Sequence, residues 1–152
     1  MLFTSWNRKI ETTGFDILIL WRQARSELES FLKEQPENDT LIGDLALTNM
    51  GVGDKAAALT LSDRAMATNP IEKDALWGPV PIEILARVAA RMGERDRAIA
   101  ALQRLLSIPG GGARALGTPL TPALLRLDPM FDRLRNDPRF QELESVAPKH
   151  SK

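Results

Sequence analysis

Two aspartates near the C-terminal end of the chain are the first candidates for chemistry. Asp128 and Asp137 lie nine positions apart, and each is followed by a proline and then by apolar residues at helical spacing. A pair of carboxylates can serve as general acid and base when a cleft separates their pKa values. Aspartate followed by proline also begins helices, because the carboxylate caps free N–H groups and proline suits the first turn. Thr121-Pro122 repeats the arrangement upstream, so the pattern favours three helix starts over catalysis.

Other groups with catalytic chemistry are scarce. The chain has no cysteine, which excludes disulfides, thiol nucleophiles and cysteine metal sites, and its single histidine, His150, lies near the C-terminal end. The glycine-rich segment PGGGARALGTP lacks the preceding strand and the following Lys-Ser/Thr that a phosphate loop requires. We therefore predict no catalytic residue, no metal and no cofactor, and we interpret residues 110–119 as a linker.

Two arginines are the main candidates for binding. Arg87 and Arg91 are four positions apart and share one helix face with Glu83. Together they could bind the carboxylate of a protein or peptide partner. The alternative is a solvated face on which Arg87 pairs with Glu83 and Arg91 pairs with Glu94. We expect the chain to form a helical array with a concave face. The candidate partner-binding residues on that face are Arg87, Arg91, Glu83, Met50 and Leu47.

These residues lie in a stretch that repeats itself. Gln35-Pro36 and Asn69-Pro70 end two apolar-periodic segments. The interval between their prolines equals the tetratricopeptide (TPR) period of about 34 residues. A proline disfavours helical geometry at the residue before it, so both dipeptides mark helix ends. The first copy of the pattern covers residues 37–70, and a second copy covers residues 79–109. The offset between the two copies is longer than this period because extra residues are inserted around EKDALWG.

The two copies resemble tetratricopeptide repeats. The small residues and the turn of the family stand in the first copy at Ala46, Gly53-Asp54, Ala58 and Ala65, followed by Pro70. The second copy repeats them at Ala86, Gly93-Glu94 and Ala98. The chain departs from the family at its bulky positions, where Ile42 and Ile82 replace the usual tryptophan and Asn49 and Ala89 the usual tyrosine. The resemblance implies an all-α, antiparallel helix-hairpin array, or α-solenoid, with short C-terminal capping helices.

The C-terminal part of the chain is similar to one particular group of tetratricopeptide proteins. The stretch from Leu120 to Glu144, together with KDALWGP, resembles the C-terminal TPR region of large bacterial signalling proteins. In those proteins the repeats follow a kinase, nucleotide-cyclase or winged-helix domain. The resemblance implies a regulatory or scaffolding module whose effector domain is missing or lies in another chain.

The domain prediction is a single helical domain over residues 14–147. It consists of a degenerate half repeat (14–36), the two repeats, the linker and a C-terminal cap (120–147), preceded by a poorly ordered segment (1–13). Trp77 is expected to fold back onto the apolar seam. With so few repeats, an apolar edge stays open on the N-terminal side, so a homodimer is a further hypothesis, formed through Ile17, Leu18, Leu20 and Trp21.

The charge balance and the hydropathy pattern limit the classes of function that the sequence allows. The 20 basic and 20 acidic side chains cancel, which argues against direct nucleic-acid binding. No apolar run reaches the roughly 20 residues of a membrane span, and the first residues lack a signal-peptide pattern, so we expect a cytoplasmic protein. We predict protein–protein interaction or scaffolding, through a peptide in the groove or through self-association. The alternatives are an enzyme with a carboxylate/arginine site and a regulatory subunit of a DNA-binding or kinase partner.

Overall fold

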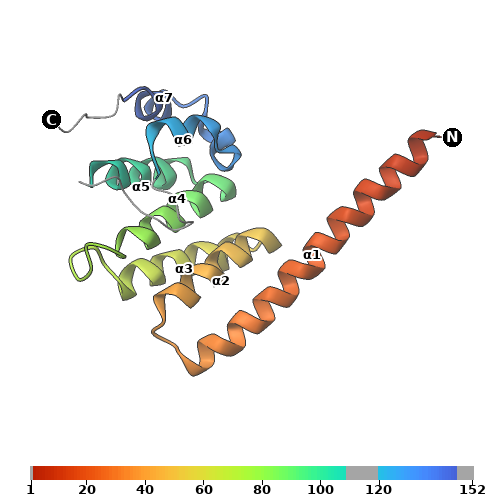
Figure 1. Cartoon of the computed structure of the whole chain (residues 1–152), viewed down its shortest axis with the longest axis horizontal. Coiled ribbons are helices and arrows are strands. Elements are labelled where there is room, and N and C mark those ends of the chain that lie inside the picture. The colour runs from red at the N-terminus through yellow and green to blue at the C-terminus, as the bar shows by residue number, and fades with distance from the viewer. Residues whose placement is uncertain (1, 109–119, 147–152) are drawn as a thin grey trace.

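All regular elements in the described part of the chain are helices (Figure 1). The computed structural model describes residues 2–108 and 120–146, with side chains from Asp16 onward in the first helix. The elements are α1 (Leu2–Glu34), α2 (Asp39–Val52), α3 (Lys55–Thr68), α4 (Pro79–Met92), α5 (Arg95–Ser107), α6 (Pro122–Leu127), the 3-10 helix η1 (Pro129–Leu134) and α7 (Pro138–Ser145). The predicted all-α class is confirmed.

The first predicted repeat forms a helix hairpin from α2 and α3. Asn38 and Asp54 begin the two helices, because their Oδ1 atoms accept the backbone N–H of Leu41 at 3.2 Å and of Ala57 at 3.1 Å. α2 ends at Gly53, whose φ of 90° lies in the left-handed region that favours glycine. A short turn therefore reverses the chain and brings α3 back against α2.

The second predicted repeat forms the same unit from α4 and α5. α4 begins at Pro79, as expected, and ends at Gly93, whose φ of 84° repeats the left-handed turn of Gly53. Small side chains are buried at the helix contacts of both hairpins, which lets the helices approach closely. The alanines that carried the repeat pattern are all fully buried, namely Ala46, Ala58, Ala65, Ala86 and Ala98.

α4 is the central helix of the described chain. Its residues from Pro81 to Ala90 are all buried. The helices α2, α3 and α5 pack against it, and η1 covers a further side. At the contact with α2, a Cβ atom on Gly43 would lie 2.6 Å from Cδ1 of Ile84, so the absence of a side chain there allows the close approach.

The C-terminal cap has the three helix starts that the sequence predicts. Thr121 begins α6, Asp128 begins η1 and Asp137 begins α7, and each side chain accepts a backbone N–H of its own first turn. Each is followed by proline at the first helical positions. The capping interpretation is therefore confirmed. Phe131, Leu134 and Phe140 are fully buried, and the two phenylalanine rings lie 6.1 Å apart.

α1 extends from the region of the predicted half repeat toward the N-terminus as a single helix. It is one helix of 33 residues, about 50 Å long, that covers both the predicted half repeat and residues 2–13, where a poorly ordered segment was predicted. Between Leu2 and Glu34 the chain has no proline, so nothing forces a break. The C-terminal half of α1 packs on α2, and the N-terminal half projects away from the other helices (Figure 1).

The expectation for Trp77 is wrong. The side chain is 55% exposed and does not fill the apolar seam. The local turn explains its position, because Oδ1 of Asp74 accepts the backbone N–H groups of Leu76 and Trp77, each at 3.0 Å. The predicted linker over residues 110–119 and the histidine His150 lie outside the described residues.

Candidate partner-binding surface

Arg87, the first predicted ligand of a partner's carboxylate, holds two carboxylates of its own chain. Its Nε and Nη2 atoms donate to Oε1 of Glu83 at 3.0 and 2.8 Å, and its Nη1 donates to Oδ2 of Asp128 at 2.6 Å. The guanidinium also lies 5.5 Å from the ring centre of Phe131. Glu83 is fully buried, and the Arg87 side chain is only 9% exposed. The pairing of Arg87 with Glu83, left open as the alternative, is the arrangement observed.

The electrostatics of Arg87 fit a structural ion pair. Burial lowers the pKa of its guanidinium, but the hydrogen bonds to Asp128 and Glu83 raise it by more, so the pKa is raised overall. Asp128 therefore has two roles, as the N-cap of η1 and as the ion-pair partner that joins η1 to α4. Only the first role is visible in the sequence. The partners Arg87 and Asp128 are 41 residues apart, and no local pattern connects them.

Arg91 lies one helical turn beyond Arg87 and is exposed. Its backbone carbonyl accepts Nη1 of Arg133 at 2.7 Å, which ties α4 to the cap a second time. The alternative pairing with Glu94 is not the one observed, because Glu94 forms its ion pair with Lys55. The two arginines thus share a helix face but differ in solvent exposure, since the cap encloses only the side chain of Arg87.

Leu47 and Met50, predicted for the same concave face, lie on α2. Both are half-buried, and both pack against an apolar cluster made of Ala46, Ala58, Ile84 and Val88. They therefore form the rim of the core between α2 and α4. The structure does not bring them into the Arg87 ion-pair network.

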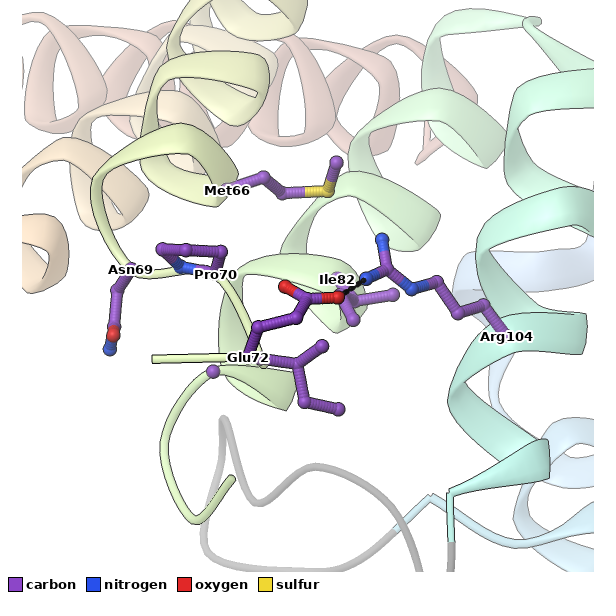
Figure 2. Close-up of a pocket in the computed structure, with 8 residues that line it drawn as sticks. Met66, Asn69, Pro70, Glu72, Ile82 and Arg104 are labelled. Carbon is purple, nitrogen blue, oxygen red and sulfur yellow. Dashed lines mark hydrogen bonds and ion pairs between the residues drawn. The ribbon is translucent and has the colours of Figure 1, made fainter. Parts of the chain in front are cut away.

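A small pocket lies where α3 ends and α4 begins. Figure 2 shows it between the chain that follows α3 and the side chain of Arg104 on α5. It has a volume of about 130 Å³, and Nη2 of Arg104 donates to Oε1 of Glu72 at its mouth, at 3.3 Å. Its lining is mixed rather than rich in acids or nucleophiles, and consists of Met66, Asn69, Pro70, Ile71, Glu72, Gly78, Ile82 and Arg104.

Several large apolar side chains of α1 are exposed. Ile17, Leu20 and Phe31 are 49%, 64% and 53% exposed, and their spacing of three and eleven residues keeps them on one side of the helix. We call these three residues the outer stripe. Leu18 is half-buried, and Trp21 packs over α2, where a Cβ atom on Gly51 would lie 2.5 Å from its ring. Of the four residues named for self-association, only Ile17 and Leu20 thus belong to the stripe.

Several kinds of site are absent from the described residues. No group of three or more His, Cys, Asp or Glu side chains there is placed to hold a metal ion. No helix in this part of the chain combines the length and the apolar character needed to cross a bilayer. No protein-family model, curated protein or solved structure matches the chain.

Proposed function

We propose that this protein is a TPR-like interaction module that binds a partner protein through the outer stripe of α1. The repeat assignment is supported by the register of the two hairpins. The interval between their left-handed glycines, Gly53 and Gly93, equals the interval between the starts of α3 and α5, Lys55 and Arg95. The stacked hairpins are further joined by the ion pair between Asp63 on α3 and Arg97 on α5.

The single observation that carries the binding function is the exposure of the outer stripe. Isolated apolar side chains on a surface are ordinary, but three large ones in register lie on one side of a helix. Three further leucines of α1, Leu18, Leu28 and Leu32, are half-buried. The stripe is therefore additional to what folding needs, and helix faces of this kind bind other helices.

The resemblance to repeat regions of bacterial signalling proteins supports a regulatory role for such a surface. In this proposal the hairpins and the cap are the scaffold that holds α1, and α1 carries the contact. Arg87 belongs to the scaffold, because its charge is used within the chain.

Site-specific photocrosslinking in the native cell tests the proposal. A photoreactive amino acid at position 20, in the outer stripe, is expected to give discrete protein adducts. The matched control is position 60, because Thr60 is an exposed residue of α3 on another surface of the molecule. Equal adduct patterns from both positions, or none from position 20, would contradict the proposal.

A further inference from the structure

The outer stripe of α1 is bordered by carboxylates. Asp16 lies four residues before Leu20, and Glu34 lies three residues after Phe31, so each is a direct neighbour on the helix surface. Glu27 lies between them in the same register, four residues before Phe31. All three acids are exposed. We call Asp16, Glu27 and Glu34 the acidic edge.

The cations whose side chains are described in α1 do not neutralise this edge. Arg22 and Lys33 each lie six residues after a member of the acidic edge, which places them about a third of a turn away around the helix. Arg25 forms its ion pair with Glu29, which is outside the edge, with Nε and Oε1 3.9 Å apart. Within the described residues, no ion pair joins a member of the acidic edge to a cation, although the whole chain has zero net charge.

From this geometry we propose that the outer stripe binds a basic amphipathic helix of a partner protein. This inference rests on the proposed interaction function and names its partner class. Apolar side chains at helical spacing on the partner would pack on Ile17, Leu20 and Phe31. Lysines or arginines beside these apolar side chains would face the acidic edge, so charge complementarity would select the partner and its orientation.

A second copy of this chain fits the surface less well. If two antiparallel α1 helices met through the outer stripe about a twofold axis, their identical edges would face each other. The acidic edge of one copy would then lie beside the acidic edge of the other. Like charges in apposition oppose association, whereas a basic helix gains from the same three carboxylates.

Binding of two synthetic peptides to the full chain tests the partner class. Both peptides have about 20 residues and the same leucines at helical spacing, and one carries lysines where the other carries glutamates. The lysine peptide is expected to bind about tenfold tighter than the glutamate peptide, because several exposed ion pairs each contribute a little. The difference should shrink as salt is added.

Charge reversal on the protein is the matched control. The variant Glu27→Lys/Glu34→Lys, with wild-type helix content by circular dichroism, is expected to prefer the glutamate peptide. The variant Leu20→Ser/Phe31→Ser is expected to weaken the binding of both peptides. Equal affinity of the wild type for both peptides, or no measurable binding of either, would overturn the inference.

Failure of this inference differs from failure of the proposed function. If light scattering shows a dimer that Leu20→Ser dissociates, and neither peptide binds, the stripe is an interface between copies. The interaction function then stands and the basic partner is rejected. If no crosslink, dimer or peptide complex depends on the stripe, the proposed function itself fails.

Discussion

The guanidinium of Arg87 and the carboxylate of Asp128 join α4 to the first turn of η1 at 2.6 Å. The same guanidinium holds Glu83, which is fully buried. One cation thus balances two carboxylates at the contact between the second hairpin and the cap. Arg87, the first sequence candidate for binding a partner's carboxylate, therefore binds carboxylates of its own chain instead.

Removing Arg87 should destabilise the protein strongly. Arg87→Ala leaves Glu83 buried without its cation, and breaking a buried pair in this way costs about 3–5 kcal/mol. Arg91→Ala is the matched control, because Arg91 is exposed one turn away, and a change within about 0.5 kcal/mol is expected there. Urea denaturation measures both free energies of unfolding. Similar losses for the two variants would show that the buried network is not structural.

A compensating variant separates charge from packing at the same place. Arg87→Met/Glu83→Gln removes the buried charges together while keeping much of the side-chain volume. It should be more stable than Arg87→Ala in the same urea experiment. If it is no more stable, the loss in Arg87→Ala comes from packing rather than from removing the cation beside the Glu83 carboxylate.

The ion pair between Lys55 and Glu94 should make a small, pH-dependent contribution. The hydrogen bond and the charge of Lys55 lower the pKa of Glu94 below its ordinary value of 4.5. A carboxyl whose folded pKa is lowered stabilises the fold above its unfolded pKa, and this contribution is lost as the pH falls through the folded pKa. Lys55→Gln should therefore lower the melting temperature slightly at pH 7 and have no effect well below pH 4.5.

Lys33→Gln is the control for this titration, because Lys33 is exposed on α1 and forms no ion pair among the described residues. Melting temperatures by circular dichroism from acidic to neutral pH provide the measurement. A loss for Lys55→Gln that stays constant across this range, or that grows on acidification, would contradict the assignment to Glu94.

The two hairpin turns should respond alike to substitution. Gly53 and Gly93 have φ values of 90° and 84°, and a side chain in this region costs about 1–2 kcal/mol. Gly53→Ala and Gly93→Ala should each lower the free energy of unfolding by this amount, and the asparagine variants by less, because asparagine tolerates the left-handed region. No clash contributes, since a Cβ atom at either position would meet no atom of a non-neighbouring residue within 4 Å. Alanine variants as stable as the wild type would contradict the turn geometry.

Local signals in the sequence were sufficient for the hairpins and the cap. Asp54, Asp128 and Asp137 cap helices through their own first turns, and Gly53 and Gly93 end helices within one turn. Such features depend on neighbours within a few residues, so the sequence alone predicts them.

Features that depend on distant neighbours were not predictable in the same way. Helical spacing placed Arg87 beside Glu83, but whether that face meets solvent depends on η1, which begins much further along the chain, at Pro129. Trp77 was expected to fold back onto the apolar seam, and the turn around Asp74 instead holds it exposed. The outer stripe was partly anticipated through Ile17 and Leu20, whereas the exposure of Phe31 required knowing which side of α1 packs on α2.

The most direct test of the central claim is an isoleucine-methyl NMR titration of the full chain with the lysine peptide. The claim is that the protein binds through the outer stripe of α1. The methyl signal of Ile17 should shift and should broaden more than that of Ile19, which points to another side of the helix by its spacing. Signals of the buried Ile42 and Ile99 should stay unchanged. Shifts centred on Ile71 and Ile82, which line the small pocket, would contradict the claim.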